Sequence, residues 1–162
     1  MKPLILVDVD GPLNPWAAHP KPPNYRLFEI KVGWRRKLRI WLDPDHGDQL
    51  RQLAEEFGAE LAWVTTWMHR ANVEIGPRLG LPELKVIEFH AEQGWKYPAV
   101  ARYAYGRPLV WFDDDFGLHR DRNREFVHKR QPLTTALIHV DPATGITGQH
   151  LGEARKAFSG NS

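Results

Sequence analysis

The 162-residue chain has no cysteine and no long apolar run. The missing cysteines exclude disulfides, thiolate metal sites and a cysteine nucleophile. The longest apolar stretch, around Leu4–Val7, is far shorter than the ~20 residues that a membrane helix needs. It also lacks the ~7–15 apolar residues of a signal-peptide core. We therefore expect a globular protein in the cytoplasm, without a membrane partner.

Excess charge of either sign is also small. The 22 basic and 20 acidic residues leave a net charge of +2, which does not favour a nucleic-acid coat protein. The charge is unevenly distributed, however. Residues 26–39 contain six basic residues and one acid, Glu29, whereas aspartates concentrate in the first ten residues and in 113–115. This asymmetry suggests an anionic substrate near a site that already holds carboxylates.

Short apolar runs alternate with helical patterns along the chain. We predict strands at 4–7, 61–64, 84–87, 109–112 and 136–140, and helices at 45–57, 68–79, 94–105, 119–130 and from about 149. Gly58 and Gly106 are the expected helix stops, and Asp45 or Asp48 the expected N-cap of the first helix. Strand–helix alternation predicts a three-layer α/β/α, Rossmann-like fold in one domain, 1–162.

One segment breaks this alternation directly after the first strand. Between residues 25 and 43, apolar and polar residues alternate on both sides of a turn that contains Gly33. This pattern predicts a β-hairpin flap, whose tip we expect to overhang the strand ends.

Polar groups capable of chemistry follow the predicted strands. Asp8 and Asp10 follow the first strand, Thr65 follows the second, and Asp113 and Asp114 follow the fourth. Lys96 lies near the start of the helix before that fourth strand. Because ligands of open α/β sheets bind beyond the carboxyl ends of the strands, we expect these residues to converge.

These residues resemble four sequence motifs of the haloacid dehalogenase (HAD) superfamily, in the family's order. Asp8-Val9-Asp10-Gly11-Pro12-Leu13 is similar to the first motif, Thr65 to the second, Lys96 to the third, and Asp113-Asp114 to the fourth. The resemblance spans residues 4–115. It implies a central five-stranded parallel sheet and, since no room remains for a large cap domain, an open site.

The resemblance also implies a role for each group. Asp8 would attack phosphorus and form an aspartyl-phosphate, and Asp10 would protonate the leaving oxygen and then activate water. Thr65 would donate a hydrogen bond to the phosphoryl group, and Lys96 would offset developing charge. Mg²⁺ would be held by Asp8, by the Asp10 carbonyl and by Asp113 and Asp114.

Several assignments stay open from the residues alone. Thr66 is the alternative hydroxyl, Lys85 is the alternative lysine, and Asp115 competes with its two neighbours for the metal. Trp16, Trp34 and Trp67 are candidates for a substrate pocket, although packing is the more common role for such residues. Trp63 and Trp111 are expected in the core.

The function implied is that of a Mg²⁺-dependent phosphatase, because Asp10, which the dehalogenase branch lacks, is present. The substrate would be a small phosphate ester, a phosphoprotein or a nucleic-acid end. A nucleic-acid end-processing phosphatase is the alternative, since the basic hairpin and its tryptophans can contact a polynucleotide. A non-catalytic binding module on the HAD scaffold is the second alternative.

Overall fold

The computed structural model describes residues 1–160. The strands are β1 (Leu4–Val7), β2 (Arg26–Lys31), β3 (Lys37–Leu42), β4 (Glu60–Trp63), β5 (Lys85–Val86), β6 (Leu109–Asp113) and β7 (Thr135–His139). The α-helices are α1 (Asp45–Phe57), α2 (Tyr97–Tyr103), α3 (Arg120–Arg130) and α4 (Gly148–Ser159). Three shorter helical turns are η1 (Ala71–Ile75), η2 (Gly76–Leu79) and η3 (Ala91–Gln93).

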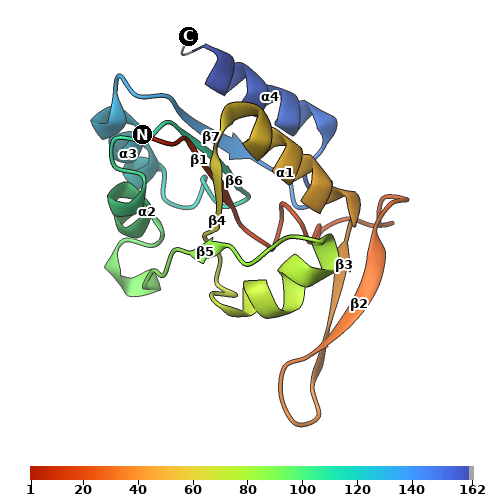
Figure 1. Ribbon diagram of the computed structural model, residues 1–162. Coiled ribbons are helices and arrows are strands. Elements are labelled where there is room, and N and C mark those ends of the chain that lie inside the picture. The colour runs from red at the N-terminus through yellow and green to blue at the C-terminus, as the bar shows by residue number, and fades with distance from the viewer. Residues whose placement is uncertain (161–162) are drawn as a thin grey trace.

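Five strands form one parallel sheet in the order β5-β4-β1-β6-β7 (Figure 1). The central strand β1 aligns Val7 with Trp63 of β4 on one side and with Phe112 of β6 on the other. All four residues of β1 are buried, as expected for a strand covered on both faces. The predicted five-stranded parallel sheet is therefore confirmed, and β1 delivers the first motif to its centre.

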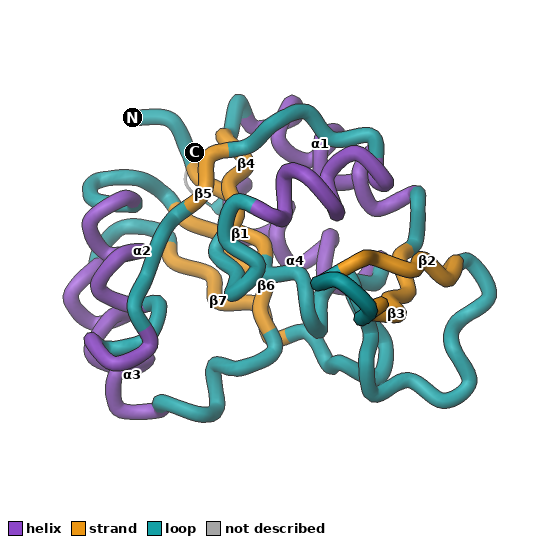
Figure 2. Tube along the Cα trace, turned by 90° about the horizontal axis from the view of Figure 1, so that it is seen from below, coloured by secondary structure: helices purple, strands orange, loops and turns teal. Residues whose placement is uncertain are grey.

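Helices cover both faces of the sheet, so the predicted three-layer arrangement is also confirmed. Ile5 and Val7 of β1 pack in a core cluster with α1 and α4, whereas Leu4 and Leu6 pack in a second cluster with α2 and α3. This alternation follows from the period of two along a strand. Figures 1 and 2 show α2 and α3 on one side of the strands and α1 and α4 on the other.

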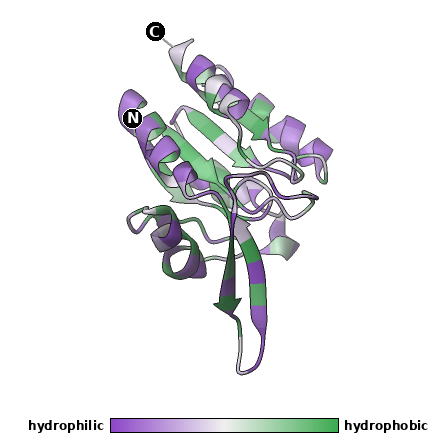
Figure 3. Cartoon of the chain, turned by 90° about the vertical axis from the view of Figure 1, so that its right-hand side faces the viewer, coloured by the Kyte–Doolittle hydropathy of each residue, from purple (hydrophilic) through white to green (hydrophobic). Residues whose placement is uncertain are grey.

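The predicted hairpin forms β2 and β3, which pair antiparallel from Arg26↔Leu42 to Lys31↔Lys37. Ile30 and Ile40 are buried toward the body, and the colours along the hairpin alternate in Figure 3. Arg70 Nη2, in the segment after β4, donates to the Lys31 carbonyl at 3.2 Å, so the outer part of the hairpin lies beside the carboxyl end of β4. The tip itself is open to solvent, and Trp34 there is 90% exposed (Figure 1).

The first helix has the predicted bounds, and Gly58 ends it in the left-handed conformation with φ 59°. The predicted N-cap is wrong. Pro44 occupies that position. Asp45 and Asp48 lie in the first turn, where their negative charges interact favourably with the positive end of the helix dipole. The Asp43 carboxylate instead accepts a hydrogen bond from the Asp45 N–H at 2.9 Å.

Two other predicted helices are shorter than expected. The segment 68–79 folds as the π-helical turn η1 followed by the 3₁₀ turn η2, and 94–105 contains α2 only from Tyr97 to Tyr103, before the left-handed Gly106. Left-handed backbone at Met68 and Trp95, with φ 51° and 60°, prevents a regular helix from starting at either place. Within residues 1–160, no helix combines the length and apolarity needed to cross a membrane.

Candidate active site

The central position of β1 brings two motif aspartates together. Asp8 follows β1 and Asp113 ends the neighbouring strand β6, and the Asp8 N–H donates to the Phe112 carbonyl at 3.1 Å. Asp8 is 6% exposed and Asp113 is fully buried. Two carboxylates therefore lie at the carboxyl edge of the sheet, largely out of water.

Lys96 joins these aspartates from the third motif. Its Nζ donates to Asp8 Oδ2 at 3.1 Å and to Asp113 Oδ2 at 2.7 Å, and it lies 3.6 Å from Asp115 Oδ2. The residue stands immediately before α2 and is 1% exposed. Lys85, the alternative from the sequence, is an exposed residue of β5.

Burial and ion pairing shift the pKa values of these buried groups in opposite directions. Burial raises the pKa of Asp8, although Lys96 and the Thr65 hydroxyl oppose the rise. Burial and the nearby Asp8 raise the pKa of Asp113 well above its ordinary value. Burial disfavours charge on Lys96, but the three carboxylates around it outweigh burial, and its pKa is raised. The ammonium is thus charged throughout the physiological range.

A third carboxylate completes a candidate metal centre. Asp8, Asp113 and Asp114 each offer an oxygen atom, and these atoms lie within 4.8 Å of one another. Gly11 permits this approach: it has φ 104°, and a Cβ there would lie 2.6 Å from Asp114 Cγ. Hard divalent cations prefer such all-oxygen sites. The cluster can therefore hold a metal ion.

The structure separates the two candidate hydroxyls. Thr65 is fully buried, and its side chain is near enough to Asp8 to lower the pKa of that carboxyl, whereas Thr66 is exposed and lines a surface pocket. The structure also distinguishes Asp115 from its two neighbours. Asp113 and Asp114 belong to the candidate metal cluster, whereas Asp115 lies outside it and accepts a hydrogen bond from Trp95 Nε1 at 2.9 Å.

Asp10 is held differently from Asp8. Trp67 Nε1 donates to its Oδ2 at 3.0 Å, and Asn14 Nδ2 donates to its Oδ1 at 3.0 Å. Asn14 also accepts a hydrogen bond from the Trp41 N–H of β3 at 3.1 Å. The Asp10 carboxylate thus has two neutral donors and is oriented without a cation bound to it.

Sequence reasoning missed most of the groups that orient these carboxylates. Indole N–H groups of Trp16, Trp95 and Trp111 donate to Asp114, Asp115 and Asp113 respectively, at 3.3, 2.9 and 3.2 Å. Trp111 is a core residue, as expected, yet it also binds a site carboxylate. The high count of seven tryptophans was the available signal.

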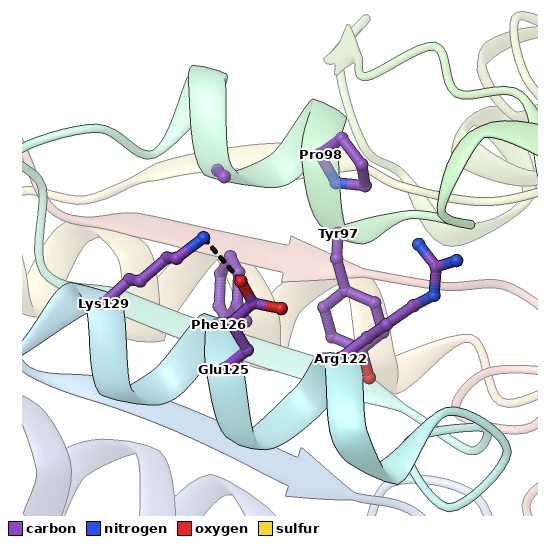
Figure 4. A pocket seen from close by; sticks show the side chains of 7 residues that line it. Tyr97, Pro98, Arg122, Glu125, Phe126 and Lys129 are labelled. Carbon is purple, nitrogen blue, oxygen red and sulfur yellow. Dashed lines mark ion pairs between the residues drawn. The ribbon is translucent and has the colours of Figure 1, made fainter.

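A separate pocket lies between α2 and α3 (Figure 4). It has a volume of about 270 Å³, and its walls include Tyr97, Phe126 and Arg122, with the Glu125–Lys129 ion pair beside them. Tyr97 lines this pocket, whereas the preceding Lys96 binds the aspartates. The chemistry-bearing residues are therefore gathered at the strand ends and not in this pocket.

A known protein family matches most of the chain. Residues 4–151 match the family described as the HAD domain in Swiss Army Knife RNA repair proteins. The chain belongs to this family. The match covers all four motifs and confirms the resemblance to the HAD superfamily.

A solved structure of a hypothetical protein from Xanthomonas campestris is 19% identical to this HAD domain. The alignment covers 98% of this chain and 84% of that one, with a TM-score of 0.46. A similarity at this level says nothing about activity. No curated protein matched the sequence.

The buried ion pairs predict a large and pH-dependent effect of removing Lys96. Lys96→Met leaves Asp8 and Asp113 buried without their cation and should lower the free energy of unfolding by about 3–5 kcal/mol at pH 8. Carboxyls whose folded-state pKa is raised stabilise the fold in acid and lose that contribution as the pH rises through the folded-state pKa. The loss should therefore be smaller at pH 5.

Urea denaturation of the metal-free protein at both pH values measures this difference. Lys85→Met is the matched control and should stay within about 0.5 kcal/mol of the wild type, because Lys85 is exposed. Equal, small losses for the two variants would contradict the structural role of Lys96.

Proposed function

We propose that this HAD domain is a Mg²⁺-dependent phosphomonoesterase that forms an aspartyl-phosphate on Asp8. One observation carries the proposal: Lys96 binds Asp8 and Asp113 together, while Asp10 stands apart from this cation. The two carboxylates of the first motif thus have different environments. That difference suits a nucleophile and a proton carrier, whereas a binding module has no need of it.

The chemistry divides between these two residues. The Asp8 carboxylate attacks phosphorus, a new P–O bond forms, and the bond to the leaving oxygen breaks as Asp10 gives that oxygen its proton. Asp10 then takes a proton from water, which attacks the aspartyl-phosphate and releases phosphate. Thr65 and Lys96 are placed beside Asp8, where they can donate to phosphoryl oxygens.

The donor set fits Mg²⁺. Asp8, Asp113 and Asp114 would hold the ion, with the Asp10 carbonyl as a further oxygen ligand. Burial raises the pKa of all three carboxyls, because it removes the charged forms from water, and Lys96 opposes the rise only in part. Bound Mg²⁺ would offset this charge and that of the phosphate.

Turnover of an aryl phosphate should require Mg²⁺ and should be lost in EDTA. Mg²⁺ should also raise the melting temperature, because a ligand that binds the folded state stabilises it. Asp114→Asn should need more Mg²⁺ for both effects, whereas Asp121→Asn on α3 should behave as the wild type. Undiminished turnover after exhaustive chelation would refute the metal assignment.

Substitutions of the two first-motif aspartates should impair turnover at different steps. Asp8→Asn removes the nucleophile, so no phosphoenzyme should form. Asp10→Asn should reduce turnover by about 10²–10⁴-fold, because only proton transfer is lost. With a nitrophenyl leaving group, which needs little protonation, the Asp10 variant should still release a burst of nitrophenolate. Rapid-mixing absorbance measures that burst, and near-normal turnover by Asp8→Asn would disprove the covalent mechanism.

A polynucleotide end is the substrate class that two observations favour. The family is described by its occurrence in RNA repair proteins, and residues 26–39 of the hairpin contain six basic residues against one acid. Between β1 and α1, the described chain holds this hairpin and no other helix or strand. We therefore infer an open site, which can admit a long polyanion.

Removing the cations of the hairpin tip should weaken use of a phosphorylated oligonucleotide. In an Arg35→Ser, Arg36→Ser, Lys37→Ser variant, kcat/KM for the oligonucleotide should fall, and its log–log dependence on salt should become shallower by about 0.7 per lost single-strand contact. The matched control removes Arg51, Arg155 and Lys156 from α1 and α4. Equal slopes in the two triple variants would count against the polynucleotide assignment.

A further inference from the structure

We propose that a pocket between the hairpin and the turn after β4 binds the terminal base of a single-stranded polynucleotide whose terminal phosphate lies at Asp8. The inference rests on the phosphatase function proposed above and adds a subsite to it. The pocket is lined by Val32, Leu38, Thr66, Trp67 and Arg70 and has a volume of about 200 Å³.

Strand alternation explains why the hairpin supplies apolar walls here. Ile30, Val32, Leu38 and Ile40 share one face of the hairpin, since side chains two residues apart point the same way. Ile30 and Ile40 are about 1% exposed against the body, whereas Val32 and Leu38 remain 37% and 41% exposed. The hairpin therefore extends its apolar face beyond the core and leaves it open at the pocket.

Trp67 connects this pocket to the chemistry. The indole lines the pocket, and its Nε1 donates to Asp10 Oδ2 at 3.0 Å. In the proposed mechanism, Asp10 protonates the leaving oxygen, so the leaving group must lie on the Asp10 side of the phosphate. The substrate part nearest that oxygen therefore lies within reach of Trp67.

The walls suit a flat aromatic ring. An indole, two aliphatic side chains and the Arg70 guanidinium surround the space, and Arg70 lies 5.7 Å from the centre of the Trp67 ring. Arg70 is held there by a hydrogen bond from Nη2 to the Lys31 carbonyl at 3.2 Å. Bases stack on aromatic and guanidinium surfaces largely without regard to sequence.

Size and charge restrict the occupant further. The pocket is smaller than the ~300–1,000 Å³ that drug-sized ligands occupy, so it suits one ring system. A base that enters it must be unpaired. A phosphotyrosine ring has a similar shape, but the surrounding hairpin carries six basic residues against Glu29, which favours a polyanion.

The test compares the contribution of one base in two hairpin variants. The probe is a short single-stranded oligonucleotide with a terminal phosphate and a dye at its other end, prepared with the terminal base present or replaced by an abasic residue. Versions phosphorylated at the 3′ end and at the 5′ end are both used. Binding is measured by fluorescence anisotropy on the 162-residue chain with Asp8→Asn, and kcat/KM is measured on chains with Asp8 intact.

Leu38→Glu places a charge in the pocket, and Leu27→Glu is its matched control. Leu27 is 36% exposed and lies on the opposite face of the same hairpin. The two variants therefore share the added charge and its general repulsion of a polyanion. Leu38→Ser provides a second pocket variant if Leu38→Glu does not fold.

With Leu38 intact, the terminal base should strengthen binding by about tenfold, in line with the ~1–3 kcal/mol of one stacked base. Leu38→Glu should reduce this factor to near one, and Leu27→Glu should retain it. Equal affinity for the base-bearing and abasic probes would overturn the proposal, as would equal losses in the two variants or a preference for a phosphotyrosine peptide. If no ester is hydrolysed, the phosphatase function fails, but the binding comparison still decides the subsite.

Discussion

The Lys96 ammonium is the interaction on which the site's arrangement depends. It lies between Asp8, Asp113 and Asp115, which arrive from β1, from β6 and from the loop after β6. Buried carboxylates this close together repel each other strongly unless a cation compensates them. Lys96 reaches that position because the preceding residues Gly94 and Trp95 both have left-handed backbone. A Cβ on Gly94 would lie 2.8 Å from Pro98 Cγ, so the turn before α2 tolerates little change.

Besides Lys96, neutral hydrogen-bond donors orient the aspartates of the site. Four indole N–H groups each bind a different aspartate of the site, and they come from segments distributed over residues 16–111. An indole orients a carboxylate without neutralising it, so the negative charge stays available to a metal ion or a proton. The indoles thereby fix the orientation of the carboxylates and leave the compensation of their charge to Lys96 and to a bound cation. This role accounts for four of the seven tryptophans in the chain.

The sheet and the convergence of the motifs could be predicted from the sequence, because both depend on local patterns. Runs such as Leu4–Val7 identify buried strands, and parallel strands present their carboxyl ends at one edge. The turns at Met68 and Trp95 could not be predicted, since tertiary contacts impose left-handed backbone that local propensity disfavours. The partners of Asp10 and Asp114 were missed for a related reason. Trp67 and Trp16 lie 57 and 98 residues away from them, and no local pattern indicates which indole reaches which carboxylate.

The contacts of Asp10 link the hairpin to the residue that we propose transfers the proton. Asn14 binds Asp10 with its amide nitrogen and the Trp41 N–H of β3 with its amide oxygen, so a single side chain spans both. Trp67 makes a second link, since it binds Asp10 and also lines the same pocket as Val32 and Leu38. A displacement of the hairpin therefore moves the partners of Asp10, whereas Asp8 stays fixed by Lys96 and the sheet. The residue proposed as nucleophile is therefore held by the sheet and by Lys96, whereas the residue proposed as proton carrier is coupled to the hairpin that we propose meets the substrate.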